Sequence, residues 1–550
     1  MHEIKMMPVP GNKPSIIGSI DVKLNEWVEK EQLLITIETA KGKRSIKSEV
    51  AGIVAAIKVE IGDNVTAGQV LMEIQTETAE MAEPIAEDHQ LVEEKQFDLV
   101  ILGAGPGGYV AAIYAAMNGL KVGLVEKADL GGTCLHVGCI PTKTLIESAN
   151  LYQKLRELDK FGLSAENVTF DFTKIMERKK EVIATLTGGI EYLMKKHKIE
   201  VIAGMAECQR DGSVLVKGEK TWRLRSKDLI LAVGAKQARV NISGIDLDCV
   251  LTSDMALSLE ALPKSITIIG AGVIGMEFAF IFNSFGVEVQ VIEFMDSILS
   301  TIDREATDLL QKIAESRGIK FHLSAKVEMI QKTENNMAVV TYQKAGQKLC
   351  IASEKVLLAI GRIPNTDGLG LENTEVKTEK GAIVVDSFMQ TSAAHIYAIG
   401  DVTNIMQLAH VASHQAITAV QRILGQTQPM SYQAVPAVIF THPEIATVGV
   451  TQVDAGQHES SRFDFSGNGK ALVMGENTGF VKLIKDKSQG RMVGAVIIGP
   501  DAATMINTVT LAIDQGLSEK ELCQMIFPHP TTAEAVHEAA MDLGLGALHQ

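Results

Sequence analysis

Two cysteines five positions apart are the residues best suited to do chemistry in this chain. Cys134 and Cys139 stand in the stretch GGTCLHVGC, and the other four cysteines are scattered at positions 208, 249, 350 and 523. Zinc is the minor interpretation, because it needs about four ligands and no second cysteine pair completes the set. A structural disulfide is disfavoured, because so short a loop restricts little of the unfolded chain. We therefore expect a cycling dithiol, with one sulfur facing a substrate and the other an electron acceptor.

Two glycine-rich turns are suited to holding dinucleotide phosphates. Each reads GxGxxG, follows an apolar strand, opens a helix and is answered by an acid at the end of the next strand. Glycine is needed because a diphosphate must approach the amide groups that open the helix. The acid can accept hydrogen bonds from ribose hydroxyls. The residues are Gly103, Gly105, Gly108 and Glu126 in the first copy, and Gly270, Gly272, Gly275 and Glu293 in the second.

The surroundings of the two turns predict different cofactors. Glu293 is followed by Phe-Met-Asp and not by arginine, so the second turn should favour NAD over NADP, whose extra phosphate would meet a carboxylate. The first turn lies directly before the cysteine pair. A flavin there would exchange electrons with sulfur on one side and with nicotinamide on the other.

Length and composition predict several compact domains. A chain of 550 residues is too long for one core, and a formal net charge of -15 argues against a nucleic-acid or membrane partner. The start of the chain lacks the apolar core of a secretory signal, and we expect a cytoplasmic protein. Changes in composition and pattern predict the boundaries 1–76 for a small β domain, 77–95 for a charged flexible linker, 96–243 and 244–365 for two dinucleotide-binding domains, 366–434 for a central domain and 435–550 for an interface domain.

The first 76 residues contain an internal repeat. Residues 22–38 align with 59–75 at an offset of 37 positions, with apolar residues matching along both copies. Alternating apolar positions and short turns predict brief strands, and therefore a two-sheet β domain built by duplication. Lys41 stands between the copies, beside Gly42, at an expected hairpin tip. Taken alone, it would be an ordinary solvated lysine.

Longer motifs resemble a known family over roughly residues 96–550. GGTCLHVGCIPTK is similar to the redox signature of the flavin disulfide reductases, and its ending CIPTK resembles dihydrolipoamide dehydrogenases more closely than glutathione reductases. The segments AIGRIPN (359–365), IYAIGD (396–401), LAH (408–410) and HPTTAEA (529–535) also match. The resemblance implies an α/β fold with two Rossmann-like dinucleotide-binding domains and an α+β dimerisation domain, preceded by a small all-β lipoyl-type domain.

The resemblance also implies the ligands of each cofactor. Lys143 and Glu277 would pair beside the flavin ring, where nicotinamide stacks. FAD would be held by Gly103, Gly105, Gly108, Glu126, Thr133, Lys143, Ala206, Asp401 and Ala409. NAD would be held by Gly270, Gly272, Gly275, Glu277, Glu293, Val327 and Gly361.

Oxidising a dithiol by disulfide exchange requires a base for the substrate protons. His529 is the candidate, with Glu534 five residues later to orient the ring and raise its basicity. The motif HPTTAE matches the family's catalytic pair, in which the histidine comes from the other subunit of a C2 homodimer. The departures from the family pattern put the rate and the pKa values in question, not the reaction. They are His136, Phe527, the stretch 232–235, and His414 with Gln415.

The duplicated β domain resembles a lipoyl domain, whose modified lysine would be Lys41. A biotin carrier is the weaker alternative, because Met-Lys-Met is absent. A covalent lipoyl arm on a flexible tether would meet its own dehydrogenase, other lipoyl domains, or the acyltransferase and decarboxylase components of a 2-oxo acid dehydrogenase complex. The predicted function is oxidation of protein-bound dihydrolipoyl groups through FAD to give NADH. The alternatives are a related flavin disulfide reductase with another substrate, and a passive lipoyl carrier or assembly subunit.

Overall fold

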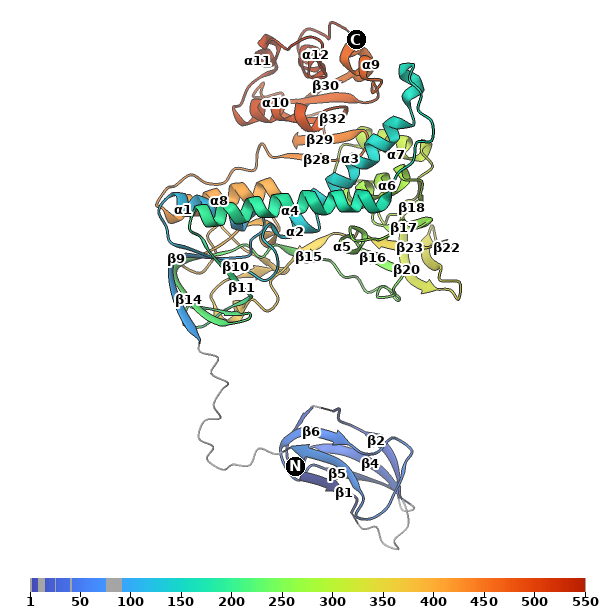
Figure 1. The fold of residues 1–550 in the computed structure, drawn as a ribbon, viewed down its shortest axis with the longest axis vertical. Helices are drawn as coiled ribbons and strands as arrows, with labels where there is room; N and C mark the ends of the chain where they lie inside the picture. Colours follow the sequence, from blue (N-terminus) through green and yellow to red (C-terminus); the bar gives the residue numbers. More distant parts are fainter. Residues whose placement is uncertain (1, 8–14, 25, 40–41, 76–91, 550) are drawn as a thin grey trace. The chain divides into compact units, whose positions relative to one another are not determined.

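The computed structural model divides the chain into two compact units, Met1–His89 and Gln90–Gln550. It describes residues 2–7, 15–24, 26–39, 42–75 and 92–549, and Figure 1 shows the elements of each unit. Among the described residues, no helix combines the length and the apolar character needed to cross a membrane. The architecture is mixed α/β with an all-β domain at the front, as the sequence predicts.

The smaller unit consists of two four-stranded antiparallel sheets that share one strand pattern. The orders are β1-β8-β6-β3 and β5-β4-β2-β7. Strands β2, β3 and β4 in one copy correspond to β6, β7 and β8 in the other, each pair 37 positions apart, which confirms the duplication. The inward-facing Ile, Leu and Val side chains form one core. The strands are β1 (His2–Lys5), β2 (Ser15–Ile20), β3 (Trp27–Val28), β4 (Leu33–Thr39), β5 (Gly42–Lys47), β6 (Gly52–Ile57), β7 (Asn64–Val65) and β8 (Val70–Gln75).

The larger unit begins with a sheet in the order β11-β10-β9-β14-β13-β12, and β27 pairs with β14. Its central strands are parallel and buried, so they need helices on their faces. Helix α1 packs against α8, and α4 crosses the middle of the unit in Figure 1. The elements are β9 (Glu93–Leu102), α1 (Pro106–Met117), β10 (Val122–Glu126), α2 (Gly132–His136), α3 (Cys139–Leu155), η1 (Leu158–Phe161), α4 (Phe172–Lys196), β11 (Glu200–Ala203), β12 (Met205–Cys208), β13 (Val214–Lys217), β14 (Thr221–Leu231), β27 (Ile396–Ala398), η3 (Gly400–Thr403) and α8 (Ala409–Ile423).

A second parallel sheet, in the order β16-β23-β17-β18-β19, repeats the strand-turn-helix-strand plan. A three-stranded antiparallel sheet follows it, and two short ladders, β15 with β24 and β25 with β26, complete the region. The elements are β15 (Ala235–Gln237), β16 (Val250–Thr252), α5 (Ser253–Ala256), β17 (Ser265–Ile269), α6 (Val273–Ser284), β18 (Glu288–Ile292), α7 (Arg304–Ser316), β19 (Lys320–His322), β20 (Ala325–Lys332), β21 (Ala338–Lys344), β22 (Gln347–Ser353), β23 (Lys355–Leu358), β24 (Arg362–Pro364), η2 (Leu371–Asn373), β25 (Thr378–Glu379) and β26 (Ala382–Ile383).

The C-terminal region is an antiparallel sheet in the order β28-β29-β32-β31-β30 with helices on it. Helix α10 packs on β29 and β32, and α12 packs on β30 and β31. Buried residues of this sheet join the core formed by α3 and α6. Helix α3, which begins at Cys139, and helix α6, which follows the second glycine turn, are therefore packed together with this sheet. The elements are β28 (Pro436–Ile439), β29 (Glu444–Gly449), β30 (His458–Asp464), η4 (Phe465–Gly467), α9 (Gly469–Met474), β31 (Phe480–Asp486), β32 (Met492–Gly499), α10 (Ala502–Asp514), α11 (Glu519–Gln524) and α12 (Glu534–Asp542).

Candidate active site

The first glycine of each turn has a left-handed backbone conformation and lies against an alanine carbonyl oxygen. Gly103 and Gly270 lie in the left-handed region, with φ values of +99° and +104°. A Cβ atom on Gly103 would lie 2.5 Å from the Ala232 carbonyl oxygen, and one on Gly270 would lie 2.4 Å from that of Ala359. Both conformation and space therefore require glycine at the ends of β9 and β17.

The other two glycines of each turn serve different purposes. A Cβ on Gly108 would lie 1.8 Å from the Gly103 carbonyl oxygen, and the second copy repeats this contact at 2.0 Å from Gly275 to Gly270. In contrast, apart from the adjacent residues of the chain, no atom of the described residues lies within 4 Å of a Cβ placed on Gly105 or on the equivalent residue of the second turn, Gly272. The third glycine permits packing, whereas the middle one leaves open space at the helix N-terminus, where a diphosphate fits.

Glu126 and Glu293 hold the two turns in place. In the first copy, the Ala104 N–H donates to Glu126 Oε2 at 2.6 Å and the Ala128 N–H donates to Oε1 at 2.9 Å. In the second copy, the Ala271 and Met295 N–H groups donate to Glu293 at 2.6 and 2.8 Å. Each carboxylate oxygen has a further lone pair, so it can still accept from a ribose hydroxyl.

The helix that carries Cys134 rests on the first glycine turn. The Gly131 N–H donates to the Ala104 carbonyl at 2.8 Å, and a Cβ on Gly132 would lie 2.7 Å from Gly105 Cα. At the other end of α2, a Cβ on Gly138 would lie 3.2 Å from Cys134 Cα. Glycine thus lets the chain fold back between the helices and start α3 at Cys139.

The two sulfurs differ in acidity. Both cysteines are free thiols; Cys134 is partly buried, and Cys139 is exposed when its backbone and side chain are taken together. A hydrogen bond from Cys134 lowers the pKa of Cys139 to about 7; desolvation of the sulfur opposes this shift and the Lys143 ammonium supports it. The same hydrogen bond, together with burial, raises the pKa of Cys134. Cys139 is therefore the sulfur that carries the thiolate near neutral pH.

Lys143 and Glu277 form a pair between α3 and α6. Lys143 Nζ lies 2.9 and 3.0 Å from the two Glu277 carboxylate oxygens, and 4.6 Å from the centre of the Phe440 ring. Glu277 is only 3% exposed and also accepts the Phe440 N–H at 3.1 Å. Since Lys143 follows Cys139 by one helical turn, the pair places a fixed charge beside the thiolate. The sequence predicted Lys143 and Glu277 as partners; it gave no signal for Phe440.

Arg362, on β24, lies between helix α2, which carries Cys134, and the η3 turn, which carries Asp401. Its Nη2 donates to the Ala235 carbonyl at 2.6 Å and to Thr133 Oγ1 at 3.4 Å. Its Nε is buried and has no hydrogen-bond partner among the described residues. Burial raises the pKa of Asp401, and the Arg362 charge opposes that shift. An orphaned guanidinium donor next to an open glycine turn fits an anionic cofactor such as FAD.

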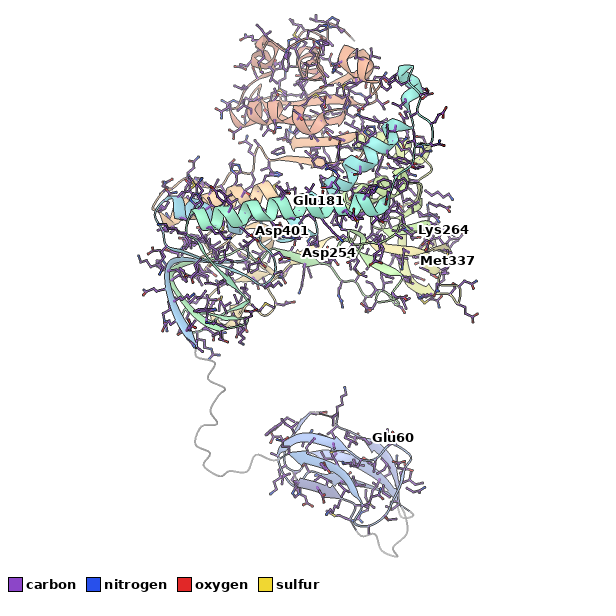
Figure 2. All side chains as sticks on the ribbon, in the orientation of Figure 1. Glu60, Glu181, Asp254, Lys264, Met337 and Asp401 are labelled. Atoms are coloured by element: carbon purple, nitrogen blue, oxygen red, sulfur yellow. The ribbon has the colours of Figure 1, made fainter. Side chains whose placement is uncertain are left out.

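The remaining predicted cofactor residues take the following places. Ala409 is the first residue of α8, and Asp401 lies in η3, labelled in Figure 2 just below α4 in that view. Ala206 lies on β12 opposite Val216, Val327 lies on β20 opposite Tyr342, and Gly361 has φ +99° with no described atom within 4 Å of a Cβ.

His529 and Glu534 pair with each other near the start of α12. His529 Nδ1 lies 2.9 Å from Glu534 Oε1, and the Thr531 N–H donates to Oε2 at 2.8 Å. Burial opposes the shift, but the bonds from Thr531 and His529 lower the pKa of Glu534 overall. The His529 side chain is 79% exposed. Within one chain the pair is not brought to the cysteines, since α12 and α2 lie at separate levels of the larger unit in Figure 1.

Two of the residues that depart from the family pattern, His136 and Phe527, each have a defined contact. His136 Nε2 lies 2.8 Å from the Leu130 carbonyl oxygen, and the Phe527 ring packs 5.5 Å from that of His537. Lys41 lies outside the described residues. On either side of it, Thr39 and Gly42 are paired as the ends of β4 and β5, and Thr39 Oγ1 donates to the Gly42 carbonyl at 2.8 Å.

Two models of one known protein family match most of the larger unit. The family described as pyridine nucleotide-disulphide oxidoreductase matches residues 97–416, and its dimerisation domain matches residues 435–540. The chain belongs to the pyridine nucleotide-disulphide oxidoreductase family. It is therefore an oxidoreductase and a flavoprotein that uses FAD and NAD with a redox-active cysteine pair, and the dimerisation domain makes it a homodimer. Residues 6–74 match the family described as biotin-requiring enzyme, which contains lipoyl domains.

Individual relatives agree with the family assignment. The dihydrolipoyl dehydrogenase of Bacillus subtilis (strain 168) is 42% identical over 471 residues, which is 82% of this chain and 99% of that protein. The dihydrolipoyl dehydrogenase of Geobacillus stearothermophilus is 38% identical over 82% of this chain and 96% of its own length. These matches confirm the expected branch of the family.

Solved structures show the same fold. LpdA from Mycobacterium tuberculosis superposes with a TM-score of 0.76 at 29% identity, over 82% of this chain and all of its own. The HOCl-induced flavoprotein disulfide reductase RclA from Escherichia coli, solved as a Cu(II) complex, gives 0.73 at 30% identity, over 81% of this chain and 99% of its own.

Proposed function

We propose that the chain is an NAD-dependent dihydrolipoyl dehydrogenase whose reaction passes through Cys134 and Cys139. The observation that carries the proposal is the placement of this cysteine pair on the first glycine turn, with one sulfur of pKa about 7 one helical turn from Lys143. In each cycle the substrate dithiol reduces the enzyme disulfide. One S–S bond breaks and one forms. Of the two protons that leave the substrate, one stays on the Cys134 thiol and later accompanies the electron pair to NAD, and the other is taken by the base and released.

The two sulfurs take separate roles in the proposal. Cys134 forms the mixed disulfide with the substrate, because a substrate thiolate that attacks it breaks the enzyme S–S bond and expels Cys139, whose lower pKa makes it the better leaving thiolate. Cys139 is the electron-rich sulfur on the flavin side, because the Cys134 hydrogen bond and Lys143 favour its thiolate. When bound, FAD relays the electron pair from the dithiol to NAD.

The base in the proposal is His529 of the partner subunit, supported by the partner subunit's Glu534. Within a chain, Nδ1 is held by Glu534 at 2.9 Å, so Nε2 is the free nitrogen that can take a substrate proton. The high exposure of the ring in one chain agrees with a role across the dimer interface.

The cofactor contacts remain those expected from sequence. For FAD they are Gly103, Gly105, Gly108, Glu126, Thr133, Lys143, Ala206, Asp401 and Ala409. For NAD they are Gly270, Gly272, Gly275, Glu277, Glu293, Val327 and Gly361. Support comes from the open space at both middle glycines and the unpaired Arg362 nitrogen. We also retain the domain boundaries 96–243, 244–365, 366–434 and 435–550, and a cytoplasmic location, as proposals.

The front domain is proposed to carry a lipoyl group on Lys41. The β4–β5 hairpin that flanks this lysine supports the assignment. A lipoyl arm on residues 1–76, tethered by 77–95, would be oxidised by this enzyme after reduction within a 2-oxo acid dehydrogenase complex. The acyltransferase and decarboxylase of such a complex are the proposed partners.

A comparison of substrates tests the proposed function. The purified dimer should reduce NAD with dihydrolipoamide, and should show on the order of 100-fold lower activity with NADPH and glutathione disulfide, because Glu293 disfavours a 2′-phosphate. Equal activity with the second pair would reject the assignment. Intact-mass measurement of the N-terminal unit would show a lipoyl adduct that is absent from a Lys41→Arg variant.

A further inference from the structure

Gln415 is a completely buried amide on α8, with 0% of the residue exposed. Both ends of its side chain are hydrogen bonded. Its Oε1 accepts the Gly400 N–H at 2.6 Å, and its Nε2 donates to the Tyr432 hydroxyl at 2.8 Å. A buried amide that bonds a main-chain N–H in a distant turn fixes the position of that turn.

The turn that Gln415 holds is the one that presents Asp401. Gly400 has φ +74° and follows β27, whose continuation at Ile399 donates its N–H to the Leu231 carbonyl at 3.0 Å. The Gly400 carbonyl accepts the Thr403 hydroxyl at 2.8 Å. Gln415 therefore fixes the peptide plane before Gly400, and Thr403 fixes the plane after it. Together these bonds set the direction in which Asp401 leaves the turn.

The same helix begins with Ala409, the second FAD contact proposed in this region. Helix α8 lies against α1, where Ser413 Oγ lies 3.4 Å from the Pro106 carbonyl and a Cβ on Gly107 would lie 3.3 Å from the Ala412 carbonyl. Helix α1 opens at the first glycine turn. Helix α8 is therefore already packed against the helix of the first glycine turn. Gln415 links α8 to the turn that carries Asp401.

The network continues from Gln415 into the connection to the C-terminal sheet. The Tyr432 hydroxyl, which Gln415 bonds, also donates to the Met389 sulfur at 3.9 Å. Burial raises the pKa of Tyr432, so its hydroxyl stays protonated and can donate. Because Tyr432 lies shortly before β28, this link ties the Asp401 turn to the segment leading to the dimerisation domain.

We propose that Gln415 is a positioning residue for the flavin site, which holds the Asp401 turn and the Ala409 helix start at a fixed separation. The inference rests on the proposed FAD contacts. Gln415 itself touches no reacting group; it acts through Gly400. Removing its amide would leave a buried N–H without a partner, and the turn would relax to recover a hydrogen bond elsewhere.

The test compares FAD binding in Gln415→Leu with that in Gln421→Leu. Gln421 is a matched control, because it lies on the same helix and donates to another tyrosine hydroxyl, that of Tyr114 at 3.4 Å, without contacting the Gly400 turn. The Gln415 variant should release FAD about tenfold more readily, measured by recovery of flavin fluorescence, and the control should match the wild type. Equal FAD release by the two variants would overturn the proposal.

Two further variants keep the proposal testable if Gln415→Leu folds poorly. Tyr432→Phe retains the bond to Gly400 and should change FAD release less than about threefold; Gln415→Glu retains an acceptor and should restore most of the binding. A Tyr432→Phe effect as large as loss of Gln415 would place the role in the tyrosine and contradict the proposal.

A separate readout distinguishes this inference from the FAD assignment. Asp401→Ala should weaken FAD binding, and no effect would reject the proposed Asp401 contact. Hydrogen exchange of the Gly400 amide reports on the turn itself. It should accelerate at least about tenfold in Gln415→Leu and not in Gln421→Leu, whatever the fate of the Asp401 assignment. Unchanged protection would show that Gln415 does not position the turn.

Discussion

The unequal acidity of the two sulfurs is the residue-scale feature that gives the site its direction. Cys139 carries the thiolate because Cys134 donates to it and Lys143 lies one turn away. Lys143 is fixed in turn by Glu277, which is itself bonded by the Phe440 N–H. The fixed ion pair thus keeps a positive charge near the sulfur without a mobile counter-ion.

This asymmetry predicts a pH dependence of the reduced enzyme. The pKa of Cys139 is lowered to about 7, so its thiolate predominates above that pH and becomes protonated as the pH falls below it. The long-wavelength charge-transfer absorbance, which arises from the thiolate beside oxidised flavin, should decrease as the pH is lowered, with a midpoint near pH 7. Anaerobic titration of the dithiol-treated enzyme measures it. An absorbance independent of pH between about 5 and 9 would contradict the assigned thiolate.

The His529–Glu534 pair predicts a loss of turnover without a loss of folding. Glu534→Gln removes the negative charge that stabilises the imidazolium formed after proton transfer, and dihydrolipoamide oxidation should fall on the order of 100-fold. His549→Gln is the control, because it removes the 2.7 Å bond between His549 and Glu538 of α12 and leaves the His529–Glu534 bond in place. Similar losses in both variants would mean that the effect comes from α12 as a whole.

At the residue scale, the sequence could predict the members of the site but not their supports. The cysteine pair and the glycines were predicted because their chemistry demands a residue type at a fixed spacing, whereas Lys143 and Glu277 were implied only by the resemblance to the family. The Phe440 amide, the orphaned Arg362 nitrogen and Gln415 come from distant segments that only the folded chain brings near. No local pattern predicts such contacts.

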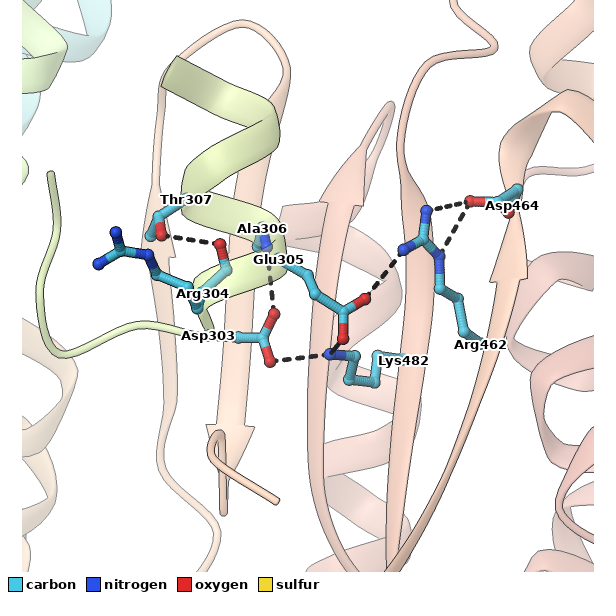
Figure 3. A network of polar contacts seen from close by, with 8 residues as sticks. All are labelled: Asp303, Arg304, Glu305, Ala306, Thr307, Arg462, Asp464 and Lys482. Carbon is cyan, nitrogen blue, oxygen red and sulfur yellow. Dashed lines mark hydrogen bonds and ion pairs between the residues drawn. The ribbon is translucent and has the colours of Figure 1, made fainter. Parts of the chain in front are cut away.

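At the scale of elements, the N-terminus of α7 is joined to the C-terminal sheet by a network of charges (Figure 3). Lys482 on β31 lies 2.9 Å from Asp303 and 2.6 Å from Glu305, and Arg462 on β30 bonds Glu305 at 2.9 Å. Asp303 also caps α7 through the Ala306 N–H at 3.1 Å. Lys482 and Asp303 have only 6% and 8% of their side chains exposed, so both charges depend on this pairing.

Lys482→Met should therefore destabilise the protein by about 3–5 kcal/mol, because Asp303 would remain buried without its partner. The free energy of unfolding in urea measures the change. Lys348→Met is the control, since its partner Glu328 lies on the surface, with 65% and 38% of the two side chains exposed. That variant should change stability by less than about 1 kcal/mol. A loss below about 1 kcal/mol for Lys482→Met would show that the network contributes little.

The sequence predicted the element plan well where apolar period and glycine turns coincide. Both strand-turn-helix-strand units form as expected. It did not predict that α3 and α6 share one core with the C-terminal sheet. That packing depends on side chains more than a hundred positions apart, and no local pattern encodes it.

At the scale of the whole molecule, the front domain and the flavoprotein are separate compact units. Each has its own core; the smaller one is closed by its two sheets. The repeat in the sequence predicted this duplicated architecture, because both copies keep the same apolar positions. The state of Lys41 cannot follow from the fold, since modification depends on another enzyme.

Removing residues 1–91 should therefore leave the flavoprotein intact. The shortened dimer should keep its FAD and oxidise free dihydrolipoamide within about twofold of the full-length rate, because the larger unit has hydrophobic cores of its own. It should lose any oxidation of a tethered lipoyl group, which depends on a high local concentration. Loss of FAD or of activity with the free substrate would show that the two units depend on each other.

The most direct test of the central claim replaces each sulfur in turn. Cys134→Ser and Cys139→Ser should both retain bound FAD, since neither residue is among the predicted FAD contacts, and both should lose oxidation of dihydrolipoamide by at least about 1,000-fold, because a hydroxyl cannot form the disulfide. Steady-state NADH formation measures it, with flavin absorbance as the control for folding. Undiminished turnover in either variant would contradict the account.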